Sequence, residues 1–98
     1  MVENIAKYVT TVKKSAAPET PILVTEWSAW YTPVEAYHDT AAMASFVVKT
    51  VHDVDLSDVQ CFSLWAFSDI FEEQGFTWDV FNGGFGLVNR FGIRKPVY

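Results

Sequence analysis

Carboxylates and aromatic rings gather at the ends of two short apolar runs in the sequence, residues 22–25 and 59–67. The set comprises Glu26 and Trp27 at the end of the first run, and Trp65, Ser68, Asp69, Glu72 and Glu73 at or after the end of the second. An apolar ring face can lie against the C–H face of a pyranose while carboxylates accept hydrogen bonds from its hydroxyls. One carboxylate could also attack the anomeric carbon, so these residue types favour a sugar site.

The first run, which ends at Glu26, is preceded by a predicted helix. Apolar side chains recur at helical spacing from Val2 to Val12, which predicts a helix over residues 2–14. No capping residue precedes it, and we interpret this start as a cut into a longer chain. Residues 22–25 predict a strand buried on both faces, with Glu26 at its carboxyl end.

The second run is preceded by a second predicted helix. Asp39 or Thr40 can cap this helix, and its helical period ends near residues 52–53. Residues 59–67 are almost continuously apolar, as expected of a second buried strand.

Two long connections flank these elements. Residues 27–37 are rich in aromatics, including Trp30 and Tyr31, and loops of this length usually carry function. Residues 68–92 have no clear period and contain the glycine-rich segment 81–86. We expect this second connection to be an ordered loop.

The order helix, strand, helix, strand predicts an α/β protein with parallel strands. Two parallel strands leave two open edges and an uncovered apolar face. We therefore expect the chain to be part of a larger barrel or sheet, or to self-associate.

Composition excludes several classes of partner and cofactor. Half of the residues are apolar and the net charge is −5, so neither nucleic acid nor an anionic membrane is an expected partner. No apolar run approaches the length of a membrane span, the N-terminus lacks the pattern of a secretory signal, and the compartment stays open. The lone cysteine, Cys61, fits a core residue, and the spacing of His38 and His52 predicts no metal site.

The sequence resembles the retaining glycoside hydrolases that include bacterial β-xylosidases and lysosomal α-L-iduronidase. The likeness runs from about residue 21 to residue 98, and the xylosidase branch is the nearer one. Four blocks in one order carry it: Thr25-Glu26-Trp27 with Tyr31 and Pro33, His38-Asp39-Thr40, residues 62–73, and residues 81–87. Asn82 departs from the His more usual in this family, and Ser28 departs from the more usual Asn after the Glu.

The resemblance implies that residues 1–98 are a single segment of a catalytic (β/α)8 domain. The segment would be the last quarter of the barrel: helix, strand 7, helix, strand 8 and a long loop, incomplete on its own. Glu26 would then be the catalytic nucleophile, and Glu72 and Glu73 would bind glycone hydroxyls. Trp65 would form a wall of the site, whereas Trp27 and Tyr31 could equally serve the substrate or the packing.

The implied reaction is a double displacement that hydrolyses a terminal, xyloside-like glycoside with retained configuration and needs no cofactor. Family members place the acid/base in an Asn-Glu-Pro motif, which does not occur here. We therefore expect the chain to be nearly inactive alone on unactivated glycosides. Two alternatives stay open: a non-catalytic carbohydrate-binding or assembly module derived from such a barrel, and a segment of a longer gene product without independent function.

Overall fold

The computed structural model describes residues 1–32, 35–54, 58–69 and 79–98. The elements in chain order are helix α1 (Val2–Lys13), strand β1 (Leu23–Trp27), the 3₁₀-helix η1 (Ala36–Asp39), helix α2 (Ala41–Asp53) and strand β2 (Cys61–Leu64). This order confirms the predicted alternation of helices and strands. The boundaries of both helices lie within about two residues of those expected from their apolar period.

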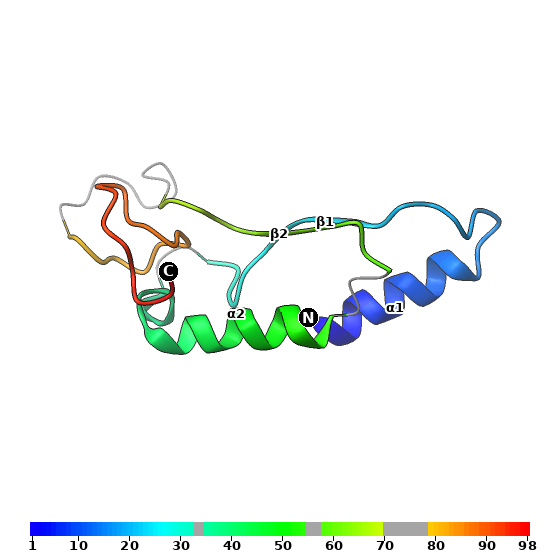
Figure 1. Ribbon diagram of the computed structural model, residues 1–98, viewed down its shortest axis with the longest axis horizontal. Helices are drawn as coiled ribbons and strands as arrows, with labels where there is room; N and C mark the ends of the chain where they lie inside the picture. Colours follow the sequence, from blue (N-terminus) through cyan, green and yellow to red (C-terminus); the bar gives the residue numbers. More distant parts are fainter. Residues whose placement is uncertain (33–34, 55–57, 70–78) are drawn as a thin grey trace.

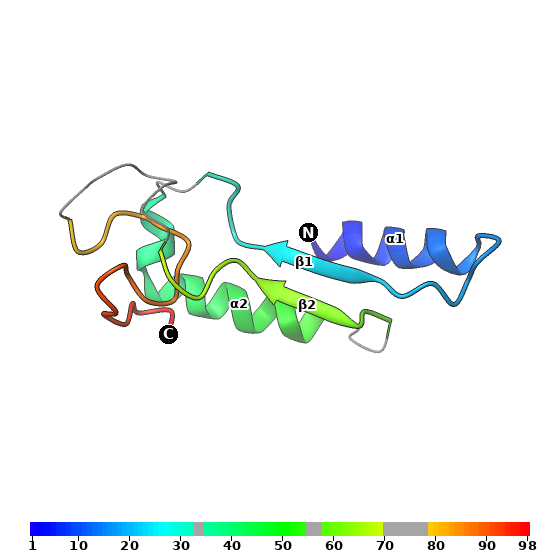
Figure 2. The same ribbon diagram turned by 90° about the horizontal axis from the view of Figure 1, so that it is seen from above.

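The two strands pair in parallel, as the helical crossover between them requires. Leu23 lies opposite Cys61 and Trp27 lies opposite Leu64, with an irregularity in the register between Val24 and Trp27. Both helices lie on the same side of the strands, α1 beside β1 and α2 beside β2 (Figures 1 and 2). The carboxyl ends of both strands therefore point in the same direction.

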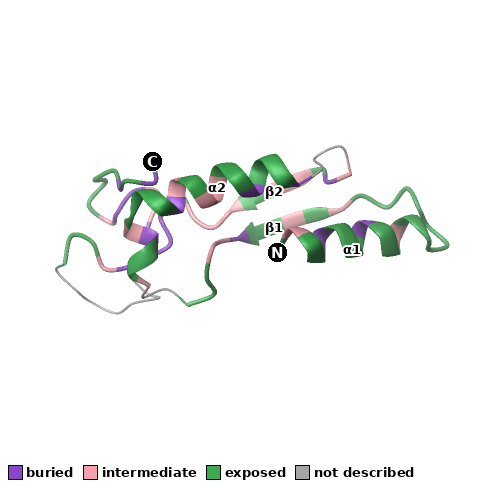
Figure 3. Ribbon diagram, turned by 90° about the horizontal axis from the view of Figure 1, so that it is seen from below, coloured by how far each residue is buried: buried purple, intermediate pink, exposed green. Residues whose placement is uncertain are grey.

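One face of the sheet is packed and the other is open, which corrects the expectation that residues 22–25 are buried on both faces. Leu23 is 57% exposed and Thr25 is also exposed. The reason is that α1 and α2 cover only one side, and no other described residue forms a strand or helix on the second side (Figure 3). A continuous apolar run cannot by itself reveal that one of its faces lacks a cover within this chain.

The apolar core joins α1 to the strands. Its buried members are Ile5, Val9, Val54 and Val59, and Val2, Ile22, Val24 and Phe62 pack against them. The two members from α1 lie four residues apart, so they share one face of the helix. Neither helix among the described residues is long and apolar enough to cross a membrane.

We predict that Ile5→Ala loosens α1 from the strands. Ile5 is 8% exposed, and truncating such a side chain costs about 2–5 kcal/mol through lost burial and the resulting cavity. Thermal unfolding followed by far-UV circular dichroism should show a lower Tm. Lys7→Ala is the matched control, because Lys7 lies on the exposed side of the same helix. Equal Tm values for the two variants would contradict this role of Ile5.

Candidate functional site

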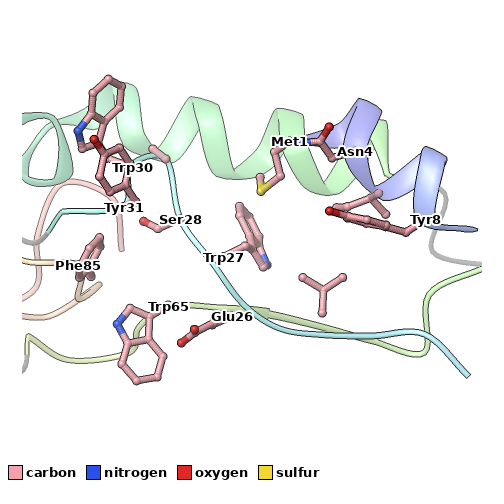
Figure 4. A pocket seen from close by; sticks show the side chains of 13 residues that line it. Met1, Asn4, Tyr8, Glu26, Trp27, Ser28, Trp30, Tyr31, Trp65 and Phe85 are labelled. Atoms are coloured by element: carbon pink, nitrogen blue, oxygen red, sulfur yellow. The ribbon is translucent and has the colours of Figure 1, made fainter.

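An open cleft of about 860 Å³ lies at the carboxyl end of β1. It extends toward the first turns of α1, where its walls are largely apolar (Figure 4). The residues that line it are Met1, Asn4, Ile5, Tyr8, Val24, Glu26, Trp27, Ser28, Ala29, Trp30, Tyr31, Trp65 and Phe85. Four of the six predicted site residues, Glu26, Trp27, Tyr31 and Trp65, therefore line one cleft.

Glu26 supplies a carboxylate to this cleft. It is the fourth residue of the five-residue strand β1, and it is exposed to solvent. No other Asp or Glu lines the cleft within the described part of the chain. An exposed carboxylate at a strand end can receive a ligand hydroxyl, or attack an electrophilic carbon, without first breaking an internal ion pair.

Trp65 lines the same cleft as Glu26 because the backbone places it at the end of the neighbouring strand. The Trp65 amide donates a hydrogen bond to the carbonyl oxygen of Trp27 at 2.8 Å, directly after β2 ends at Leu64. The Trp65–Ala66 peptide bond is cis. The indole and the Glu26 carboxylate lie next to each other in the view of Figure 4. The two strands thus bring together one carboxylate and one large aromatic ring, as predicted.

Trp27 combines a place in the cleft wall with a place in the packing. It is 6% exposed, stacks on Phe62 with ring centroids 4.6 Å apart, and lies 6.3 Å from the ring of Phe46. Its indole Nε1 is buried without a hydrogen-bond partner among the residues that the structure describes. Trp27 therefore anchors the end of β1 on the helix-covered side of the sheet, and its role toward a substrate stays a prediction.

Trp30 and Tyr31 form an exposed aromatic pair at the rim of the cleft. Their rings stack with centroids 6.2 Å apart and planes 14° from parallel, and Tyr31 is 88% exposed. Large apolar surface exposed in this way is typical of a binding surface.

Phe85 is a cleft residue that sequence reasoning missed. It belongs to the glycine-rich segment, and backbone bonds hold it next to the end of β2: Ala66 donates to the carbonyl of Phe85 at 3.3 Å, and Leu87 donates to that of Ala66 at 3.1 Å. Its ring packs against buried His38, with centroids 4.8 Å apart. The sequence signal that could have identified Phe85 is its position between Gly84 and Gly86, because glycines allow another part of the chain to approach the backbone closely.

Asp69 braces this segment. The sequence left it open whether Asp69 supports the loop or contacts a ligand. In the structure Asp69 is 8% exposed, and its carboxylate accepts hydrogen bonds from the amide of Gly86 and from Lys95 Nζ, each at 2.8 Å. These bonds favour the supporting role.

Glu72 and Glu73, which were predicted to bind a ligand, lie outside the described residues. Their contacts with glycone hydroxyls therefore stay predictions. Within the described ranges, no three His, Cys, Asp or Glu residues come together as a metal site.

The chain matches the sequence model of one family, described as "Glycosyl hydrolases family 39", over residues 1–98. It is 46% identical over 78 residues to a β-xylosidase of Caldicellulosiruptor saccharolyticus, covering 80% of this chain and 16% of that protein. It is 35% identical to a β-xylosidase of Geobacillus stearothermophilus over all 98 residues, which are 19% of that protein.

The backbone matches solved structures equally well. A family 39 β-xylosidase from Caulobacter crescentus superposes with a TM-score of 0.90 at 40% identity, covering 99% of this chain and 22% of that chain. The family 39 enzyme from Xanthomonas axonopodis pv. citri gives a TM-score of 0.89 at 38% identity, covering 98% and 19%. The chain thus spans about a fifth of the length of the relatives that it matches.

Proposed function

Because the chain belongs to glycosyl hydrolases family 39, we propose that it carries the nucleophile of a retaining, β-xylosidase-like glycoside hydrolase. The observation that supports this most directly is the position of Glu26. It lies exposed at the carboxyl end of a parallel strand, in a cleft with aromatic walls that Trp65 also lines. In parallel α/β barrels the reacting groups come from this end of the strands.

The proposed reaction proceeds by double displacement. An oxygen of the Glu26 carboxylate forms a bond to the anomeric carbon as the bond to the leaving oxygen breaks. Water then attacks the same carbon, the bond to Glu26 breaks, and a second carboxyl group takes the proton of the water as the sugar is released. This second carboxyl group, standing about 5–5.5 Å from that of the nucleophile, must protonate the leaving oxygen in the first step. This sequence has no Asn-Glu-Pro motif, so we assign the second group to the rest of a complete barrel.

In this proposal β1 and β2 are strands 7 and 8 of a (β/α)8 barrel, and residues 1–98 are one segment of its catalytic domain. The arrangement of the layers supports this assignment. Both helices cover one face, as the outer ring of such a barrel does, while the open face carrying Leu23 and Thr25 would turn toward the barrel interior. Trp65 and Phe85 would then be walls of the sugar site, with Glu72 and Glu73 on its hydroxyls.

The test uses a substrate that needs no acid. A 2-deoxy-2-fluoro-β-xyloside with a dinitrophenolate leaving group can react with the nucleophile alone, and the fluorine slows the second step so that the adduct accumulates. Intact-mass measurement should show one glycosyl adduct, and peptide mapping should place it on Glu26. An adduct on another carboxylate would overturn the assignment of Glu26. The absence of any adduct would mean that Glu26 needs the rest of a barrel before it can react with a glycoside.

A second candidate function is a non-catalytic carbohydrate-binding module. The exposed Trp30–Tyr31 stack at the cleft rim favours it, together with the missing acid motif. Calorimetry with xylose and xylobiose separates the two functions. Binding without any labelling by the fluoro-xyloside would favour the module.

We also predict that the chain associates with further strands, either in a second copy or in the remainder of the barrel. The described residues form one sheet of two strands, whose outer edges present unpaired backbone groups. Sedimentation velocity of the 98-residue chain should show species heavier than the 11.1 kDa monomer as concentration rises. A monomeric mass at every concentration would contradict self-association.

A further inference from the structure

A buried lysine lies behind the Phe85 wall of the cleft. The side chain of Lys95 is 0% exposed, and its Nζ lies 2.7 Å from Asp39 Oδ1 and 2.8 Å from Asp69 Oδ1. Nζ also donates a hydrogen bond to the carbonyl oxygen of Gly84 at 2.8 Å. One cation near the end of the chain therefore connects η1, the residues after β2 and the glycine-rich segment.

The groups around Lys95 hold the backbone of residues 83–86 at four points. Asp39 accepts from the Gly83 amide, His38 Nδ1 donates to the Gly83 carbonyl at 2.8 Å, and Lys95 donates to the Gly84 carbonyl. Asp69 accepts from the Gly86 amide. Backbone groups on both sides of Phe85 are thus fixed by side chains from distant parts of the sequence.

We call these four side chains, His38, Asp39, Asp69 and Lys95, the clamp. They hold the backbone on both sides of Phe85, which lines the cleft, but Lys95 and Asp69 do not line the cleft themselves. Phe85 lies between Gly84, whose carbonyl Lys95 binds, and Gly86, whose amide Asp69 binds. Its ring is further held against His38. A movement of the clamp would therefore move the Phe85 ring relative to Glu26 and Trp65, and would change the width of the cleft.

We propose that Lys95 is a positioning residue for the cleft, setting the place of the Phe85 wall through Gly84 and the two carboxylates without contacting the sugar. This inference rests on the proposed function for its consequence in sugar binding. The clamp itself can be tested whether or not the chain reacts with a glycoside.

The experiment uses the 98-residue chain and two variants. Lys95→Met keeps most of the side-chain volume but leaves the partly buried Asp39 and the buried Asp69 without a cation, so it can unfold the region. Lys95→Met combined with Asp69→Asn restores the net charge of the buried group from −2 to the native −1, and the side-chain amide oxygen of the introduced asparagine can still accept from the Gly86 amide. Lys49→Met is the matched control, because Lys49 pairs with Asp53 on the exposed surface of α2.

Amide hydrogen exchange measured by NMR reports on the clamp. In the double variant we expect the Gly83 and Gly86 amides to exchange about 100-fold faster than in the native chain, while the amides of α1 change little. Lys49→Met should leave both glycine amides unchanged. If both glycine amides exchanged at the native rate in the double variant, the proposal would be overturned. Charge balance alone would then hold residues 83–86 in place without Lys95.

Labelling by the fluoro-xyloside gives the second measurement. The half-saturating concentration should rise about fivefold in the double variant because an aromatic wall is displaced. The maximal rate should stay near the native value because Glu26 is unchanged. A lower maximal rate with an unchanged half-saturating concentration would contradict a role in positioning Phe85. If the native chain is not labelled, the proposed function of the isolated chain fails, while hydrogen exchange still decides the role of Lys95.

Discussion

Glu26→Gln is expected to abolish glycosyl labelling of the chain. The amide has nearly the size and shape of the carboxylate but is a very poor nucleophile, so the rate should fall by about 10⁴-fold or more. Because Glu26 is exposed and makes no ion pair within the described residues, the substitution should not disturb the fold. The measurement is the release of dinitrophenolate from the fluoro-xyloside, followed by intact mass.

Glu19→Gln is the control for this substitution. Glu19 is also exposed, but it lies in the connection between α1 and β1 and does not line the cleft. Its variant should be labelled at the native rate. Labelling of Glu26→Gln at that same rate would show that another group attacks the sugar, and the assignment of the nucleophile would have to be withdrawn.

Gly86→Ala is expected to disrupt the Phe85 wall by steric conflict. A Cβ atom at residue 86 would lie 2.2 Å from the backbone nitrogen of Asp69 and 2.4 Å from the carbonyl oxygen of Val88. Both are backbone atoms, which cannot rotate away as the end of a side chain can. We expect a loss of about 3 kcal/mol in the free energy of unfolding, the upper part of the usual range for overpacking. Urea titration followed by near-UV circular dichroism measures it.

Gly92→Ala separates this conflict from backbone strain. Gly92 has a φ of +78°, but no heavy atom of the other described residues, its two chain neighbours apart, lies within 4 Å of a Cβ built there. Alanine at this position should cost about 1 kcal/mol from the left-handed conformation alone. If Gly86→Ala proved no more costly than Gly92→Ala, the close approach of the backbone at residue 86 would not limit stability.

The sequence was sufficient to predict both α-helices, both strands and the place of Glu26, but not the 3₁₀-helix η1. Helical spacing of apolar residues located α1 and α2, and the apolar runs located both strands because each is local in the sequence. The crossover between the strands required parallel pairing, and hence placed Glu26 and Trp65 at the same sheet edge. These inferences need no knowledge of distant contacts.

The rest depends on contacts between residues far apart in the chain. Lys95 pairs with Asp39, 56 positions earlier (95 minus 39), and no local pattern indicates that a lysine so near the last residue is fully buried. Phe85 reaches the cleft only because the segment around it pairs with the residues after β2. The open face of β1 escaped prediction for another reason: an apolar run does not indicate which elements, if any, cover each of its faces.

The chain is elongated, with principal extents of 51 × 25 × 18 Å, and α1 and the C-terminus lie toward opposite ends (Figure 1). Two groups of buried side chains are formed at different places in the fold: the apolar group around Ile5 joins α1 to the strands, and the hydrogen-bonded group around Lys95 joins η1 to the residues after β2. Continuous chain and the β1–β2 pair connect them, so each group can open while the other persists. The cleft lies between the two groups. Its walls therefore depend on two groups of contacts that can open separately, and heating or denaturant can disrupt the cleft before the whole chain unfolds.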